Sequence, residues 1–385
     1  MTLFDFLNAP EAQQFENSLA LLACMEQWLR LSRTDAAKMC NLNTATITHL
    51  SASLLEKGLL RECGKAQSIA GRKPTFLEFE PGAGYSLILH LEQTYAQLTL
   101  HNLHHETVAA LRLPPLCHDS EPEQYLKNVL KPSSFNADYG GILGGCIICG
   151  HDLLPEQLPI SQLRELWQAE VSYPVYLSNA PSMTCLAEGH LRCPNQNATL
   201  LTLSISARQV SIGVLLGSQL LFKGPCPGLM SRRRHGITIS EEDLCLNSLV
   251  LRAYQQDVVL RGGADYDATA LLSSASPCSE ICHLARSGNR DAISVIDSYA
   301  DTLAGAVDDL FRLYRPDLLI LDGDILLYIE AINPALQKKL QANSASPLEI
   351  STPFLGKLAC AYGASRLCVK KALEQIPLQG RENCL

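Results

Sequence analysis

Small or polar residues and several cations lie near the N-terminus of the sequence. The first group consists of Thr44, Ala45, Thr46, Thr48 and His49. At the N-terminus of a helix, hydroxyls can hydrogen-bond phosphates and base edges, and small side chains leave room to enter the major groove. These five residues are therefore candidate DNA contacts, together with the nearby cations Arg33, Arg72 and Lys73.

A helix-turn-helix would position this group. Apolar residues recur at helical spacing on both sides of a break at residues 40–43, at Ala36, Ala37 and Met39 before it and Ile47, Leu50, Leu54 and Leu55 after it. Thr34 is the expected N-cap of the first helix, with Ser32 as the alternative. Asn43 or Thr44 caps the second, and Gly58 ends it. Residues 32–61 thus predict two short helices around a tight turn.

A hairpin follows the second helix. Residues 59–63 and 75–79 have strand-like patterns, and the polar residues between them include Arg72 and Lys73. Such a hairpin directly after a recognition helix predicts a winged helix whose basic tip meets phosphate or the minor groove. The alternative is an ordinary small helical domain with a solvated hairpin. The order of helix, turn, helix and basic-tipped hairpin favours DNA binding.

Composition limits the function class. The chain has 385 residues, 47% of them hydrophobic, and a net charge of −8. Its length suggests two or three domains, and the negative charge argues against indiscriminate coating of nucleic acid, although a small DNA-reading module on an acidic body remains compatible. The N-terminus lacks the pattern of a signal peptide, and no apolar run is long enough to span a membrane. We expect a cytoplasmic protein with no membrane partner.

Cysteine and histidine are not arranged as metal or redox motifs. The fifteen cysteines are scattered, and many lie in apolar runs, which is typical of buried thiols in a reducing cytoplasm. Cys146 and Cys149 form a CxxC spacing, but the two intervening isoleucines indicate a buried strand. His101, His104 and His105 are interpreted as a polar turn on an outer hairpin.

The best domain boundary is Pro81–Gly84, where helix patterns give way to strand patterns. We expect a DNA-binding domain at residues 1–80 and an α/β domain at residues 81–385. The second domain would have two lobes, approximately residues 85–180 plus the C-terminal helix and residues 181–355. Each lobe begins with a strand meander followed by α/β units, which suggests a duplicated core.

Several local strings, in their order and spacing, resemble the ROK family (repressors, open reading frames and kinases), specifically its regulator branch of the xylose-repressor kind. They are the helix-turn-helix, the wing signature Gly71-Arg72-Lys73-Pro74, Pro174–Asn179 with a downstream Glu188, Arg315–Gly323, and Ala361–Ala364. The resemblance covers nearly the whole chain. The fold that it implies is a winged helix-turn-helix joined to a two-lobed, actin-like (ribonuclease H-like) sugar-kinase domain, in the α/β class.

The sequence departs from the family's kinases at the catalytic positions. Where their phosphate loop has glycines, this chain has His90–Thr94, with an acidic Glu92 that would repel phosphate. The position of the catalytic base is Ala180, which cannot accept a proton. The family's zinc motif is missing as well, because most of its cysteines are absent. We therefore expect no catalytic residue, no cofactor and no metal.

A degenerate sugar pocket is the remaining small-molecule hypothesis. Asn179, Glu188 and His235 are its candidate effector-binding residues, although Asn179 could simply end a strand. His235 belongs to a basic run, Ser231–His235, which is either a solvated loop or a site for an anionic effector.

The sequence is interpreted as a transcriptional repressor of carbohydrate-related genes that binds double-stranded operator DNA. Its inactive ROK domain would serve dimerisation, as a homodimer or a dimer of dimers, and the sensing of a sugar, sugar phosphate or protein partner. The alternatives are a ROK sugar kinase with an appended DNA-binding domain, and a protein-interaction scaffold with a vestigial pocket.

Overall fold

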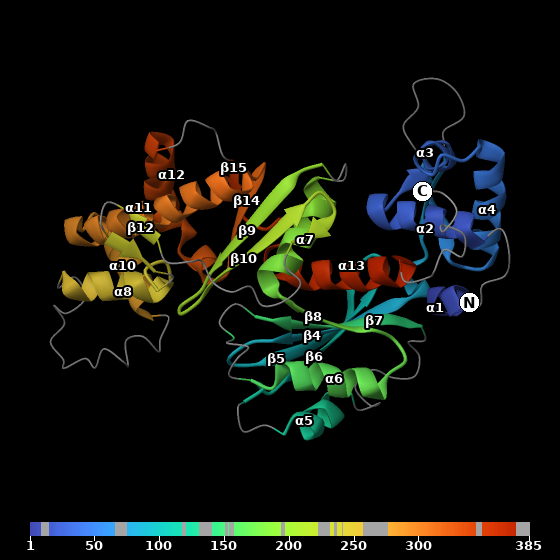
Figure 1. Ribbon diagram of the computed structural model, residues 1–385, viewed down its shortest axis with the longest axis horizontal. Coiled ribbons are helices and arrows are strands. Elements are labelled where there is room, and N and C mark those ends of the chain that lie inside the picture. Colours follow the sequence, from blue (N-terminus) through green and yellow to red (C-terminus); the bar gives the residue numbers. More distant parts are fainter. Residues whose placement is uncertain are drawn as a thin grey trace. The chain divides into compact units, whose positions relative to one another are not determined.

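The computed structural model (Figure 1) describes residues 1–8, 15–65, 75–117, 121–130, 141–150, 153, 158–193, 197–221, 232–234, 237–240, 242–256, 276–343 and 349–374. The chain forms two compact units. Unit 1 consists of Met1–Ile148, Pro155–Ser178 and Ala361–Leu385, and unit 2 of Cys149–Leu154 and Asn179–Cys360. Unit 1 therefore contains both the predicted winged helix and the first lobe of the predicted α/β domain.

The winged helix has the predicted order of elements. Helices α1 (Leu3–Asn8) and α2 (Phe15–Trp28) precede strand β1 (Leu31–Ser32), the helix pair α3 (Arg33–Met39) and α4 (Thr44–Glu56), and strands β2 (Leu60–Lys65) and β3 (Thr75–Phe79). The three strands form one antiparallel sheet in the order β1-β3-β2. Leu22, Met25, Ile47, Leu54 and Leu77 are almost completely buried in its core, which fixes α2 and α4 against the sheet.

Local signals in the sequence set the ends of α3 and α4. Ser32 is the N-cap of α3, because its hydroxyl accepts a hydrogen bond from the backbone of Asp35 at 3.1 Å, so the preference for Thr34 is wrong. Asn43 caps α4. At the end of α4, Gly58 has a φ of +70° and the amide of Leu59 donates to Leu54 at 2.9 Å, as in a Schellman motif.

Helix α2 ends at Trp28 because Leu29 adopts a left-handed φ of 59° and the chain then enters β1. One further sequence expectation for unit 1 needs correction. The expected outer polar turn instead has His101 and His105 buried. Burial lowers the pKa of His101, whose ring contacts the Thr99 hydroxyl at 2.9 Å.

The rest of unit 1 is a sheet covered on both faces (Figure 1). Strands β4 (Tyr85–Leu91), β5 (Ala96–Asn102), β6 (Thr107–Leu113), β7 (Ile142–Cys149) and β8 (Val175–Asn179) have the order β6-β5-β4-β7-β8. Helix α13 (Ala359–Glu374) lies on one face, and α5 (Pro122–Val129) and α6 (Ile160–Glu170) on the other. Two glycines of β7 allow this packing. A Cβ on Gly144 would lie 3.1 Å from Cys368 of α13, and a Cβ on Gly145 would lie 3.0 Å from Trp167 of α6.

Unit 2 repeats this strand order. Strands β9 (Thr199–Ile205), β10 (Val210–Leu216), β11 (Gln219–Leu220), β14 (Leu318–Asp322) and β15 (Glu349–Ser351) form a sheet in the order β11-β10-β9-β14-β15. When the strands of each sheet are counted along the chain, both sheets have the spatial order third, second, first, fourth, fifth. This shared order confirms the expected duplication. A short hairpin, β12 (Arg232–Arg234) and β13 (Ile237–Ile239), forms a separate sheet.

Helices pack on the sheet of unit 2. Helix α7 (Ala180–Arg192) approaches β10 so closely that a Cβ on Gly213 would lie 2.4 Å from the Pro181 carbonyl. Helices α8 (Leu246–Gln255), α10 (Ser276–Arg286), α11 (Arg290–Tyr314) and α12 (Ile329–Asn343) form a helical layer whose apolar faces join the sheet in one core. The α/β class predicted from the sequence is confirmed.

Candidate DNA interface

The N-terminal part of α4 presents the small polar residues that the sequence singles out. Thr44, Ala45, Thr48 and His49 are exposed and Thr46 is half-buried. The opposite face of the helix is buried in the core, so α4 is amphipathic and fixed in rotation. This face is therefore the one that α4 offers to a ligand.

The threonine hydroxyls on this face differ in whether they are free to donate a hydrogen bond to a ligand. The Thr48 hydroxyl donates to the carbonyl of Thr44 at 2.7 Å, so its lone pairs remain available as acceptors. The hydroxyls of Thr44 and Thr46 make no hydrogen bond to another residue in the described part of the chain. They can both donate to a phosphate or a base edge and accept from one.

Arg33 holds α4 in place. Its Nε donates to the hydroxyl of Ser51 on α4 at 3.0 Å, and its Nη2 lies 2.8 Å from the carboxylate of Glu62 on β2. One side chain thus links the start of α3 to the recognition helix and the wing. Because its charge is already paired, the geometry favours a positioning role over a phosphate contact.

Three residues predicted to bind lie outside the described residues. Arg72 and Lys73 fall in the segment between β2 and β3, and His235 falls between β12 and β13. Their assignment stays a prediction from the sequence.

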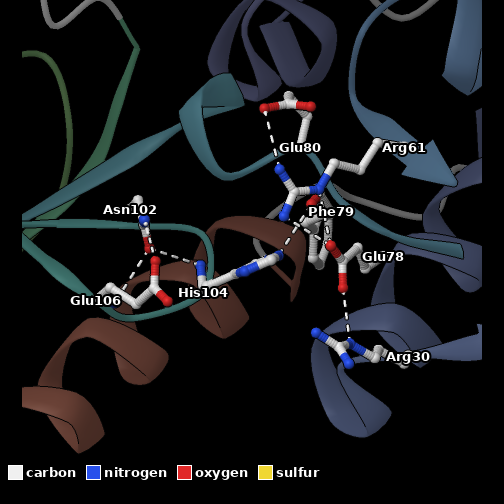
Figure 2. Close-up of polar contacts among 8 residues, drawn as sticks. All are labelled: Arg30, Arg61, Glu78, Phe79, Glu80, Asn102, His104 and Glu106. Atoms are coloured by element: carbon white, nitrogen blue, oxygen red, sulfur yellow. Dashed lines mark hydrogen bonds and ion pairs between the residues drawn. The ribbon is translucent and has the colours of Figure 1, made fainter. Parts of the chain in front are cut away.

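A buried carboxylate lies behind the wing (Figure 2). The Glu78 side chain is 3% exposed. Its carboxylate oxygens lie 2.8 Å from the guanidinium of Arg30 and 2.7 Å from that of Arg61. Burial alone would raise the pKa of Glu78, but the hydrogen bonds from Cys63, Arg61 and Arg30 outweigh it and hold the pKa below its usual value. Glu78 therefore remains ionised and fixes both arginines beside the wing strand β3.

The turn between β5 and β6 contacts the same strand (Figure 2). His104 Nε2 lies 3.0 Å from the carbonyl oxygen of Phe79 in β3. Asn102 shapes this turn, because its side-chain oxygen accepts from the amides of His104 at 2.9 Å and Glu106 at 3.1 Å. The wing is thereby tied to the sheet of unit 1.

A second connection in unit 1 is a buried ion pair. Arg366 of α13 lies 2.7 Å from Glu26 of α2, with side chains 6% and 5% exposed. Burial raises the pKa of Glu26, and the nearby cations Arg366 and Lys370 partly offset that rise. The ion pair attaches the helix behind the recognition helix to the C-terminal helix. The sequence carries no signal for a partner that is 340 positions away.

The positions matched from the sequence to the kinases' phosphate loop and catalytic base are His90–Thr94 and Ala180. In unit 1, His90 and Glu92 contact each other at 3.0 Å, and the Glu92 amide donates to Tyr95 in the hairpin turn. The Glu92 amide is therefore already hydrogen-bonded within this turn. In unit 2, Ala180 is buried in the first turn of α7.

The two described effector candidates are buried in unit 2. The Asn179 oxygen accepts from the Ser182 amide at 3.1 Å as the N-cap of α7, while its amide nitrogen has no partner among the described residues. Glu188 is fully buried and lies 2.5 Å from Arg192, and it accepts from the backbone of Phe354 at 2.6 Å. The Glu188 carboxylate is thus already bound by other residues of unit 2, whereas the Asn179 side-chain NH2 group could still donate a hydrogen bond to a ligand.

Neither a metal site nor a membrane span is found in the described residues. No three His, Cys, Asp or Glu side chains gather there in a way that could hold a metal ion. None of the helices placed in the structure is long and apolar enough to cross a bilayer.

Comparisons with known proteins agree with this architecture. The model of the ROK family matches residues 252–371. A putative xylose repressor of Caldicellulosiruptor sp. (strain Rt8B.4) is 21% identical over 402 residues, which cover 93% of this chain and 96% of that protein. The xylose repressor of Bacillus subtilis (strain 168) is 21% identical over 373 residues, with 90% and 93% covered.

Solved structures share the fold. A ROK family transcriptional regulator, homologous to the E. coli MLC protein, has a TM-score of 0.69 at 19% identity and covers 93% of this chain and 96% of its own. The ROK hexokinase from Thermus thermophilus has a TM-score of 0.54 at 19% identity, covering 74% of this chain and 98% of the hexokinase. The two-lobed sugar-kinase fold predicted from the sequence is thereby confirmed.

Proposed function

Because the chain contains a ROK family domain behind a winged helix, we propose that it is a DNA-binding transcriptional repressor of carbohydrate-related genes. The observation that carries the proposal is the polar face at the N-terminus of α4, exposed while the rest of that helix is fixed. The similarity to xylose repressors along nearly the whole chain supports a sugar-related role.

In this proposal, residues 1–80 read the operator and residues 81–385 form the ROK domain. Thr44, Ala45, Thr46, Thr48 and His49 face the major groove, and Arg72 and Lys73 at the wing tip contact phosphate or the minor groove. Arg33 supports this face through Ser51 and Glu62, since its guanidinium is held by both.

The ROK domain is catalytically inactive in this proposal. A sugar hydroxyl must lose its proton to attack a phosphate, and Ala180 cannot take it; the loss of a general base alone removes about 10²–10⁴ in rate. Glu92 adds a negative charge at the position of the phosphate loop. The domain would instead sense a sugar, a sugar phosphate or a protein partner.

The remaining parts of the proposal concern assembly and effector. A cytoplasmic homodimer, or a dimer of dimers, would present two winged helices to paired half-sites. The Asn179 amide nitrogen has no partner among the described residues, which supports a hydroxylated effector beside α7, with Glu188 and His235 as further candidates. The effector regulates DNA binding only if it binds the two conformational states with different affinity.

The test is capture of genomic DNA by the purified full chain at near-physiological salt. A palindromic motif upstream of sugar-utilisation operons would support the proposal, whereas no enrichment over random fragments would contradict it. A parallel assay of ADP release with ATP and a hexose panel tests the inactive domain. Turnover by the unaltered chain, raised further by Ala180→Asp, would instead identify a sugar kinase with an appended DNA-binding domain.

A further inference from the structure

Two thiols meet inside the winged helix. Cys24 lies on α2, and Cys40 is the residue that caps the C-terminus of α3. Their sulfur atoms are 3.2 Å apart, and the Cys40 thiol donates toward Cys24. Both residues are half-buried. This sulfur–sulfur separation is shorter than an ordinary packing contact. A disulfide bond could form after a small movement of the two sulfur atoms.

The position of Cys40 connects this pair to the recognition helix. Asn41 follows with a left-handed φ of 53°, and the Leu42 amide donates to Ala37 at 3.0 Å, which closes the end of α3. Asn43 then caps α4 through the Thr46 amide. A displacement of Cys40 is therefore transmitted over three residues to the start of the polar face of α4.

We propose that Cys24 and Cys40 are an oxidation site at which a hydroperoxide forms an intramolecular disulfide that displaces the helix-turn-helix turn and weakens DNA binding. The chemical part of this proposal is independent of function, and the effect on DNA rests on the proposed repressor function.

The reaction balances with the hydroperoxide as the oxidant. The Cys24 thiolate attacks the terminal oxygen of the hydroperoxide, which forms a sulfenic acid and releases an alkoxide that takes up a proton. The Cys40 sulfur then attacks the Cys24 sulfur, loses its proton and expels hydroxide, which leaves as water. Two thiols and one hydroperoxide thus give one disulfide, one alcohol and one water.

The environment assigns the order of attack. The hydrogen bond from Cys40 stabilises the thiolate of Cys24 and lowers its pKa, while the same bond raises the pKa of Cys40. Because the Cys40 thiol donates its hydrogen toward the Cys24 sulfur, we assign Cys24 as the attacking sulfur and Cys40 as the resolving one. The fully buried Cys185 contrasts with this pair, because burial raises its pKa to about 12.

Of the two elements that carry these thiols, the turn is less firmly packed than α2. A sulfur–sulfur bond is about 2.05 Å long, so the two sulfur atoms approach each other by roughly 1.2 Å from their separation of 3.2 Å. Helix α2 is anchored by the fully buried Leu21, Leu22 and Met25, whereas Asn41 and Asn43 in the turn are exposed. A shift of the turn by a fraction of this distance is enough to misalign a base contact at the start of α4, and we expect the loss of one such contact to weaken operator binding about tenfold.

The first experiment is chemical. The full chain is treated with hydrogen peroxide, alkylated, digested and mapped by mass spectrometry. We expect a Cys24–Cys40 crosslink in the unaltered chain and in the control Cys117→Ser, which removes a different exposed thiol. Cys40→Ser should instead accumulate a sulfenic acid on Cys24 that dimedone traps. Absence of the crosslink in the unaltered chain would overturn the proposal.

The second experiment measures the consequence. Amide hydrogen exchange across residues 40–50 should change on oxidation, and operator affinity should fall about tenfold and return with dithiothreitol. Peroxide should leave the affinity of Cys24→Ser unchanged. Equal affinity of the oxidised and reduced forms would refute the regulatory effect. Failure of the reduced protein to bind any DNA would instead refute the proposed function, and the crosslink and exchange data would still decide the oxidation site.

Discussion

The ion pair between Glu26 and Arg366 offers a quantitative test of how the winged helix is attached to α13. The substitution Arg366→Met keeps most of the apolar volume and leaves the carboxylate of Glu26 buried without its cation. Both side chains are at least nine-tenths buried, at 5% and 6% exposed. Removing one partner of a buried pair costs about 3–5 kcal/mol. We expect a loss of this size in the free energy of unfolding of unit 1.

The assay is equilibrium unfolding in urea followed by tryptophan fluorescence. The two tryptophans of the chain, Trp28 and Trp167, both belong to unit 1, so the signal reports this unit alone. Lys127→Met is a matched control, because it breaks an exposed ion pair of unit 1 with Glu123. The control should leave the urea midpoint unchanged.

The effect should depend on pH. Burial already raises the pKa of Glu26, and removal of Arg366 raises it further. A carboxyl whose folded pKa lies above its unfolded pKa of about 4.3 destabilises the fold above the folded pKa, and this penalty disappears below the unfolded pKa. The deficit of Arg366→Met relative to the unaltered chain should therefore shrink between pH 7 and pH 5.

Two results would refute this reasoning. One is a deficit at pH 7 that is no larger than that of the exposed-pair control, and the other is a deficit that grows as the pH falls. The double variant Glu26→Met/Arg366→Met separates charge from packing. It should recover most of the stability, since a buried pair is often replaced by apolar residues of similar volume without cost.

Three further predictions concern the winged helix. Thr46→Ala and His49→Ala should relax sequence preference, measured as the ratio of operator to random-DNA affinity; an equal loss on both DNAs would contradict our placement of α4 in the groove. Arg72→Ala should weaken binding to all sequences and reduce the salt slope by about one, so an unchanged slope in a salt titration would argue against a phosphate contact. Asn43→Ala removes the acceptor for the Thr46 amide and should cost about 1 kcal/mol in urea unfolding, whereas no loss would show that this cap is dispensable.

Signals that act within a few residues could be predicted from the sequence. The apolar spacing around residues 40–43 predicted α3 and α4, and Asn43 and Gly58 predicted the ends of α4. Each depends on backbone hydrogen bonds or side-chain chemistry that neighbours in the chain complete.

Only the tertiary structure decided which distant side chains meet. Glu26 with Arg366, Cys24 with Cys40, and His104 with the Phe79 carbonyl are partners separated by 340, 16 and 25 positions. Arg33 likewise finds Glu62 and Ser51 rather than solvent. A periodic pattern identifies which face of a helix is buried, but packing against other elements selects what that face contacts. The sequence by itself thus determined the polar face on α4, and the tertiary structure decided what holds that face in place.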